Sequence, residues 1–163
     1  GCCELGVKDV SGPSVLALTR ENLPQLRTQK SENLSAKGAY RLRAATADRK
    51  VVLLATGSEV EIAVDTAKAL EAQGIGADVI SMPSWAHFDA QSAAYKADIL
   101  PAGVLRVSIE AGTTFGWERY TGLDGLRFGI DSFGASAPAE ALYDHFGLTA
   151  AKIAPQIAAA LNN

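Results

Sequence analysis

Arg20 is the residue whose type and position best suit ligand chemistry. It follows the mainly apolar run Ser14–Thr19, which is typical of a short buried strand. Ligands of open α/β sheets bind at the carboxyl ends of the strands, and a guanidinium there can hold a phosphate or carboxylate with two hydrogen bonds. The alternative is a solvated arginine paired with Glu21, and spacing alone does not decide between the two.

The turn that contains Gly57 and Ser58 is a second candidate site, for an anion. It joins the apolar run 51–55 to an amphipathic stretch, so it lies at a helix N-terminus, where free N–H groups and the helix dipole attract negative charge. We favour the alternative that Ser58 caps its own helix, with Glu61 completing a capping box. The turn contains neither GxGxxG nor GxxxxGK[ST], so the sequence offers no dinucleotide fingerprint and no P-loop.

Glu110 is a third candidate, because it directly follows an expected strand and could bind a ligand or act as a base. We favour a structural role, in which Glu110 caps the next helix or pairs with Arg106. A Ser-His-Asp triad with His87 or His145 needs a GxSxG elbow or an equivalent turn, and the sequence contains none. The sequence therefore predicts no catalytic residue. Large aromatics more often fill a core or an interface than line a pocket, and we expect this of Trp85, Trp117 and Tyr120.

Composition narrows the function classes. The net charge of −3 provides no basic surface for nucleic acid, and no apolar run approaches the ~18 residues of a membrane span. The N-terminus lacks the pattern of a signal peptide. Cys2 and Cys3 are adjacent, and no Cys or His stands at metal-ligand spacing. We expect a reduced, cytoplasmic protein with no metal site.

Apolar periodicity predicts the elements that position these candidates. Strands are expected at 14–19, 51–55, 77–82, 104–109 and 126–130, and residues 38–42 are expected to form an edge strand or one arm of a hairpin. Helices are expected at 60–73, which ends before a left-handed Gly74, and at 89–97 with Asp89 as its cap, 113–120 and 138–146. A last helix follows Thr149, and Pro155 either kinks it or marks its first turn. Residues 1–10 remain unassigned, and 26–49 is expected to be mainly a linker. The alternation of strands and helices predicts a largely parallel sheet covered on both faces.

Several of these segments, in this order, resemble the transketolase family. Residues 14–25 look like its strand plus (S/T)RQNLP segment, and 51–60 like its LxATGSEV motif. Shorter matches occur at 81–85, 110–112, 116–117 and 120–122, and residues 133–142 resemble a specific family signature. The resemblance extends from about Gly12 to the end of the chain.

The resemblance implies a three-layer α/β/α fold around a mixed, mostly parallel five-stranded sheet. It assigns residues 1–45 to the end of a pyrimidine-binding domain and a linker, and 46–163 to the C-terminal domain. The intact family enzyme transfers a two-carbon ketol (glycolaldehyde) unit from a ketose phosphate to an aldose phosphate in the pentose phosphate pathway, through thiamine diphosphate held with Mg or Ca. Arg20 matches the arginine that holds the terminal phosphate of these sugar phosphates. The C-terminal domain supports a homodimer.

The chain also departs from the family. It is much shorter, and it has no counterpart of the GDG-type motif that holds thiamine diphosphate and its metal, or of the glutamate that activates the cofactor. Glu21 stands where the family has Gln. We therefore expect a fragment that is inactive alone and binds no cofactor of its own. The alternatives are a small-ligand (anion or nucleotide) or interaction module at Gly57 and Ser58, or a piece of a sister enzyme, deoxyxylulose-phosphate synthase or a ketoacid dehydrogenase E1 component. Residues 136–140 and 20–24 argue against the sister enzymes.

Overall fold

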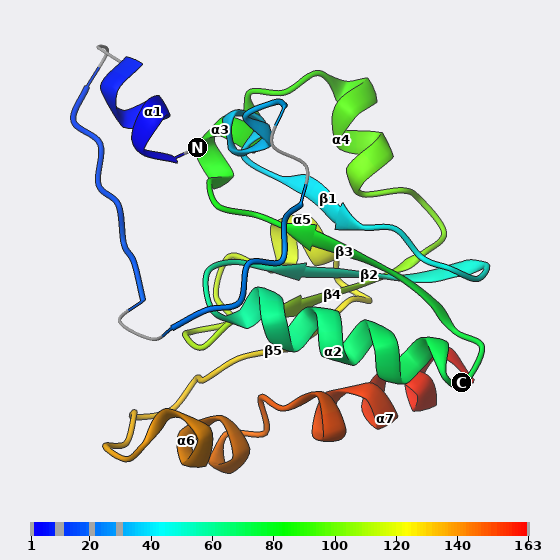
Figure 1. Ribbon diagram of the computed structural model, residues 1–163. Coiled ribbons are helices and arrows are strands. Elements are labelled where there is room, and N and C mark those ends of the chain that lie inside the picture. The colour runs from blue at the N-terminus through cyan, green and yellow to red at the C-terminus, as the bar shows by residue number, and fades with distance from the viewer. Residues whose placement is uncertain (1, 9–11, 20–21, 29–30, 163) are drawn as a thin grey trace.

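The computed structural model describes residues 2–8, 12–19, 22–28 and 31–162, which fold around one five-stranded sheet (Figure 1). The strand order is β1-β3-β2-β4-β5. The edge strand β1 is antiparallel to β3, and the other neighbours are parallel, which confirms the mixed, mostly parallel sheet. The strands are β1 (Tyr40–Arg43), β2 (Arg49–Ala55), β3 (Gly76–Ser81), β4 (Leu105–Ile109) and β5 (Leu126–Phe128).

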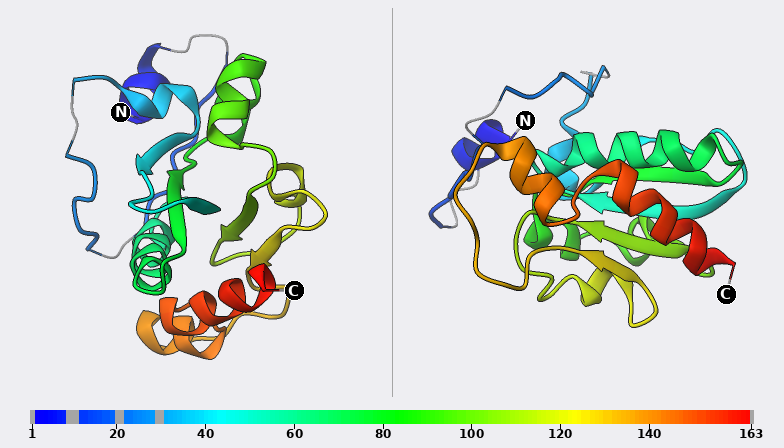
Figure 2. Two further views of the ribbon diagram at one scale, coloured as in Figure 1. Left: turned by 90° about the vertical axis from the view of Figure 1, so that its right-hand side faces the viewer. Right: turned by 90° about the horizontal axis from the view of Figure 1, so that it is seen from below.

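Helices cover both faces of this sheet, as Figure 2 shows in two further views. One face packs on α2 (Glu59–Glu71) and α7 (Ala150–Leu161). The other face packs on α3 (Trp85–Asp89), α4 (Ala93–Ile99) and α5 (Glu118–Thr121). The remaining elements are α1 (Cys2–Lys8), the 3-10 helix η1 (Leu34–Lys37) and α6 (Ala139–His145). The three-layer α/β/α architecture is therefore confirmed.

The core divides into two halves because side chains alternate across the strands. On β2, Val51 and Leu53 face α2 and α7, whereas Val52 and Leu54 face the opposite layer. All four side chains are fully buried. A strand buried on both faces needs a continuous apolar run, and this explains why residues 51–55 are recognisable from sequence.

The two ends of α2 differ in how well the sequence predicts them. At the C-terminus Gly74 has φ +78°, and Ile75 N–H donates to Leu70 C=O at 3.1 Å, which confirms the expected left-handed ending. At the N-terminus the capping box of Ser58 and Glu61 is wrong. Ser58 has helical φ/ψ of −65° and −32°, not the extended backbone that aims a capping oxygen at the helix N–H groups.

Two of the expected helices have different bounds. The helix expected at 89–97 is divided, because Asp89 ends α3 and Ser92 caps α4 by accepting a hydrogen bond from the Tyr95 amide at 3.2 Å. The helix expected at 113–120 is only the short α5, because residues 113 and 114 are hydrogen-bonded to Asp131 outside the helix. Pro155 lies inside α7, so the alternative that it marks the first turn is wrong.

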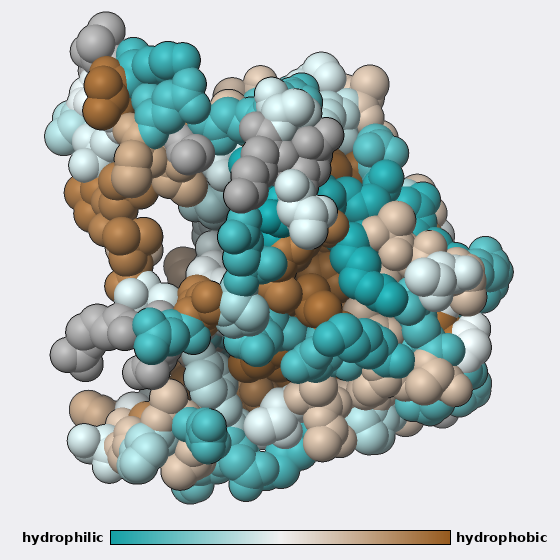
Figure 3. Space-filling model, in the orientation of Figure 1, coloured by the Kyte–Doolittle hydropathy of each residue, from teal (hydrophilic) through white to brown (hydrophobic). Residues whose placement is uncertain are grey.

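The strand expected at 14–19 is wrong. These residues are extended but pair with no strand in the described part of the chain, and Val15 and Leu18 remain 93% and 79% exposed. In Figure 3, which has the orientation of Figure 1, this segment contributes to the hydrophobic surface at the left edge of the molecule. A buried strand needs hydrogen-bonding neighbours and two covering layers, and the described residues offer this run neither.

Candidate functional site

The order of the strands defines where a ligand is expected. The chain passes from β2 through α2 to β3 on one side, and then returns to β4 on the other side of β2. The carboxyl ends of β2 and β4 therefore form the switch point of the sheet, which is the usual ligand site of open α/β folds. Glu59 follows β2 at the start of α2, and Glu110 directly follows β4.

Glu59 is buried at this switch point, with 4% of its surface exposed. Its Oε1 atom accepts a hydrogen bond from the Ser58 hydroxyl at 2.9 Å and one from the Tyr143 hydroxyl of α6 at 2.5 Å. Burial, followed by the hydrogen bond to Glu59, raises the pKa of Tyr143 to about 12. Tyr143 therefore remains a neutral hydrogen-bond donor throughout the physiological pH range.

Glu110 is a half-buried carboxyl group beside Glu59. Burial, and to a smaller degree the charge of Glu59, raises the pKa of Glu110 to about 7. Both structural roles expected for Glu110 are wrong. Arg106 donates instead to the carbonyl oxygens of Leu100, Pro101 and Tyr120, and α5 has Trp117 at its N-cap without a side-chain cap.

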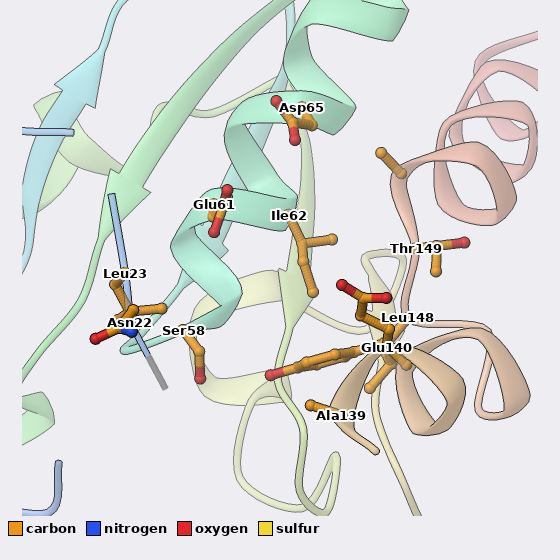
Figure 4. A pocket seen from close by; sticks show the side chains of 12 residues that line it. Asn22, Leu23, Ser58, Glu61, Ile62, Asp65, Ala139, Glu140, Leu148 and Thr149 are labelled. Atoms are coloured by element: carbon orange, nitrogen blue, oxygen red, sulfur yellow. The ribbon is translucent and has the colours of Figure 1, made fainter. Parts of the chain in front are cut away.

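A cavity of about 370 Å³ opens beside this cluster (Figure 4). Its walls come from the first half of α2, from α6 and from the start of α7, and Asn22 and Leu23 lie at one side. The ionisable groups among its described lining residues, apart from Tyr143, are the carboxylates of Glu61, Asp65 and Glu140. The volume falls within the range of small-ligand pockets.

Arg20, the strongest candidate from sequence, lies outside the described residues, as does Glu21. The residues that follow them, Asn22 and Leu23, line the cavity. The expected Arg20 site therefore remains a prediction.

Gly57 and Ser58 form the turn at the start of α2, where Gly57 has φ +55°. A second cavity, of about 250 Å³, is lined by both of them and by Arg27. The second cavity therefore has a basic residue, Arg27, in its lining beside the turn. The first cavity has no basic residue among its described lining residues, whose ionisable groups are three carboxylates and Tyr143. Anion binding at the turn remains a prediction.

The other sequence candidates take structural positions. The Trp85 ring packs edge-on against Trp117 and Tyr120, with centroids 5.1 and 5.2 Å apart, which confirms the core role of these aromatics. His87 lies within α3, and its Nδ1 is 2.9 Å from the Ser84 hydroxyl. His145 packs against Phe146.

Residues 2–8, 12–19, 22–28 and 31–162 contain no group of three or more His, Cys, Asp or Glu placed to hold a metal ion. Among the same residues, no helix is both long and apolar enough to cross a bilayer.

The contact between Tyr143 and Glu59 is the feature that the sequence did not reveal. The two residues are 84 positions apart, and no local periodicity links them. Glu59 also follows an apolar run at the first turn of a helix, where an acidic residue is ordinary. Only the packing of α6 near the start of α2 brings the pair together.

The fold and the switch-point site define an open α/β/α domain of mixed sheet. The chain matches the model of the family described as "Transketolase-like TK C-terminal domain" over residues 38–149. The chain therefore belongs to the transketolase family, and the matched part is the C-terminal domain.

Individual relatives agree with this assignment. A transketolase of Sinorhizobium medicae is 51% identical over 151 residues, which cover 91% of this chain and 22% of the relative. A chloroplastic transketolase of Solanum tuberosum is 46% identical over 92% of this chain and 20% of its own length. The chain thus spans about a fifth of the length of these curated relatives.

Solved structures show the same fold. A Pichia stipitis transketolase in complex with sedoheptulose-7-phosphate superposes on this chain with a TM-score of 0.79 and 41% sequence identity. The aligned region covers 88% of this chain and 20% of the Pichia stipitis chain. The transketolase of Leishmania mexicana has a TM-score of 0.72 at 42% identity, over 80% of this chain and 19% of that one. A split-gene transketolase, described as an inactive β4 tetramer, shares the fold at 21% identity, with a TM-score of 0.68.

Proposed function

We propose that this chain serves as the C-terminal domain of a transketolase that transfers a two-carbon ketol unit from a ketose phosphate to an aldose phosphate. The supporting observation is the family match over residues 38–149 on a sheet that superposes on transketolases of 41–42% identity. We assign residues 46–163 to this domain and 1–45 to the end of a pyrimidine-binding domain and its linker. Strand β1 (Tyr40–Arg43) falls within the range 1–45, although it pairs with β3 of the sheet.

The described residues do not fit the cofactor of such an enzyme. Thiamine diphosphate is held through a divalent metal, which needs a cluster of oxygen ligands, and the described part of the chain has no such cluster. The ketol chemistry therefore belongs to the part of a transketolase that this chain does not match. In that setting Arg20 binds the terminal phosphate of the sugar, the domain supports a homodimer, and the enzyme is cytoplasmic.

A chimera tests this proposal. Residues 38–163 replace the matching region of the Sinorhizobium medicae transketolase, and ketol transfer is measured with xylulose 5-phosphate and ribose 5-phosphate. We expect an active chimera, because the domain is similar enough to preserve the surrounding interfaces. A chimera that folds and dimerises without activity contradicts the proposal. So does transfer by the 163-residue chain alone with thiamine diphosphate and Mg²⁺.

A second chimera, extended to residues 12–163, tests Arg20. Replacing Arg20 with Ala removes a charge-assisted phosphate contact, and we expect kcat/KM for sugar phosphates to fall by about 10- to 100-fold. Arg20→Lys keeps the charge without the planar fork and is expected to lose less. Arg119→Ala is the matched control, because Arg119 is 63% exposed, pairs with Asp89 and lines neither cavity, and it should leave kcat/KM close to the parent value. Equal losses for Arg20→Ala and Arg119→Ala contradict a specific role for Arg20.

The second candidate function is a small-ligand module, and the cavities beside Ser58 favour it. Calorimetry of the 163-residue chain with inorganic phosphate and with ADP tests it directly. Binding that is lost on Ser58→Ala but kept on Arg20→Ala supports the module. Absence of heat at millimolar concentrations of both probes contradicts it.

A further inference from the structure

The second cavity, of about 250 Å³, lies on the α2 face of the sheet at the carboxyl ends of β2 and β3. This is the edge at which open α/β folds bind their ligands. The start of α2, β1, the end of β3 and residues 23–27 contribute to its walls. Figure 1 shows the segment 22–28 in blue, passing from the start of α2 towards β1. The cavity is therefore built by segments that are distant in the sequence.

Tyr40 and Ser81 bring two hydroxyl groups to the sheet side of this cavity. The two residues are directly opposite each other in the antiparallel pair of β1 and β3, so their side chains share one face of the sheet. Neither hydroxyl forms a hydrogen bond with the described residues. Both hydroxyl groups therefore remain available as hydrogen-bond donors to a ligand.

Arg27 supplies the positive charge of the cavity. Its guanidinium lies over the Tyr40 ring, 5.9 Å from the ring centroid, and this cation–π contact holds it at the cavity wall. Arg27 is half-buried and forms no ion pair with the described residues. Stacking uses the face of the guanidinium, so the N–H groups along its edge remain free to bind an anion.

Ser35 of η1 is the polar side chain that points most directly to a ligand. It lines the cavity and is only 8% exposed, yet its hydroxyl forms no hydrogen bond with the described residues. Buried hydroxyl groups are nearly always hydrogen-bonded, because an unsatisfied one carries the full cost of its desolvation. An anionic oxygen in the cavity provides Ser35 with an acceptor.

The charges around the cavity favour a ligand with one negative charge. Arg27 is the one basic residue among the described lining residues, and the helix N-terminus at Gly57 and Ser58 adds partial positive charge. Glu61, which is exposed, also lines the cavity and opposes a second negative charge. A carboxylate therefore suits this lining better than a phosphate dianion.

Apolar side chains form the rest of the wall. Leu26 and Leu42 line the cavity and pack against the core cluster beneath α2. A ligand that buries apolar surface against them gains free energy that a bare anion does not gain.

We propose that this cavity binds a small organic monocarboxylate, with its carboxylate held by Arg27 and Ser35 and its apolar body against Leu26 and Leu42. Tyr40 and Ser81 provide further donors. This inference goes beyond the proposed function, because the site includes neither Arg20 nor any part of the ketol chemistry. It also differs from phosphate or nucleotide binding by a small-ligand module.

Titration of the ¹⁵N-labelled 163-residue chain with benzoate, followed by NMR, tests the site. We expect the amides of Ser35, Gly57 and Ser81 to shift to saturation with a Kd of about 1 mM, while those of α7 stay unchanged. Benzyl alcohol has the ring without the charge, and acetate has the charge without the ring. Both should bind at least about tenfold more weakly, and inorganic phosphate should also bind more weakly than benzoate.

Variants identify the residues that hold the carboxylate. Arg27→Ala should weaken benzoate binding by at least about tenfold, and Ser35→Ala by about 3- to 10-fold. Arg119→Ala is the matched control, because Arg119 is exposed and lines neither cavity, and it should leave the Kd unchanged.

Several results would overturn the proposal. One is the lack of a saturable shift at about 20 mM benzoate. Others are equal binding of benzoate and either benzyl alcohol or acetate, tighter binding of phosphate, and a Kd that Arg27→Ala does not change. The comparison among ligands uses the unmodified chain, so it decides the question even if Arg27→Ala does not fold.

Discussion

Thr114 and Asp131 join the two loops that leave the carboxyl ends of β4 and β5. The Thr114 amide donates to Asp131 Oδ1 at 2.8 Å, and the Thr114 hydroxyl donates to Oδ2 at 2.7 Å. The Thr113 hydroxyl adds a third hydrogen bond of 2.9 Å. These loops carry Phe115 and Phe133, which are 82% and 101% exposed. The contact between Thr114 and Asp131 therefore holds the two loops together, and each loop carries one exposed aromatic side chain.

Replacing Asp131 with Ala should loosen both loops. The Thr114 amide loses its acceptor, so its hydrogen exchange should become faster, while the amides of β2 should be unaffected. The hydrogen bonds from Thr114 lower the pKa of Asp131, so their contribution is complete above its ordinary value of 3.8 and is lost as the pH falls below that value. Asp124→Ala, in the turn before β5, is the control, and equal effects of the two variants would contradict this role of Asp131.

Asp78 should be among the most important charged residues for stability. Its carboxylate is buried, 2.8 Å from Arg41 Nε and 2.9 Å from Arg49 Nη1, and it accepts the Ala45 amide at 2.8 Å. The side chains of Arg41 and Arg49 are 29% and 34% exposed, so water partly solvates them when Asp78 is removed, but the Ala45 amide loses its acceptor. Asp78→Ala should therefore lower the free energy of unfolding by roughly 2 kcal/mol. The measurement is urea unfolding at pH 7.

The control for Asp78 is Asp98→Ala. Asp98 also pairs with Arg41, at 3.2 Å, but its side chain is 62% exposed. Exposed pairs contribute about 0–1 kcal/mol, so this variant should remain close to the parent. If both variants lost the same stability, burial would not be the reason for the effect of Asp78.

Glu71 should produce an acid-sensitive part of the stability. Its hydrogen bond with Arg43, assisted by the Thr46 amide, lowers the pKa of Glu71 from 4.5 to about 2. A carboxyl group with a lowered folded-state pKa stabilises the fold above its ordinary pKa, and this stabilisation is lost as the pH falls from about 4.5 to 2. Unfolding free energies measured across this interval should fall steeply for the parent chain and less steeply for Glu71→Gln. Parallel curves for the two proteins would show that Glu71 titrates normally.

The sequence predicts those parts of the fold that local patterns determine. The run 51–55, the left-handed Gly74 and the edge strand near residue 40 are correct, because a buried apolar run, a helix ending and a sheet edge each have local signals. The strand expected at 14–19 is wrong for the opposite reason. Its residue types suit a strand, but pairing depends on partners that the described residues do not contain.

The candidate site was less predictable, because its contacts join distant segments. The sequence indicates Ser58 and Glu110 as polar groups at the strand ends, but Ser58 donates to Glu59 instead of capping α2. The spacing of Arg106 and Glu110 suggests an ion pair, whereas Arg106 donates to three main-chain carbonyl groups. Tyr143 has no signal of its own, because a tyrosine in an amphipathic helix is ordinary until its partner is known.

Thr66 provides a test of an unsatisfied polar group in the core. It lies in α2, is fully buried, and its hydroxyl has no hydrogen-bond partner among the described residues. Thr66→Val has nearly the same shape and helix propensity but no hydroxyl to desolvate, so we expect urea unfolding to show a gain of about 1 kcal/mol. Thr66→Ser keeps the hydroxyl and loses a buried methyl group, so it should lose about 1 kcal/mol. A loss of stability in Thr66→Val would mean that the hydroxyl forms a hydrogen bond within the folded domain, most simply with the carbonyl group one turn earlier in α2.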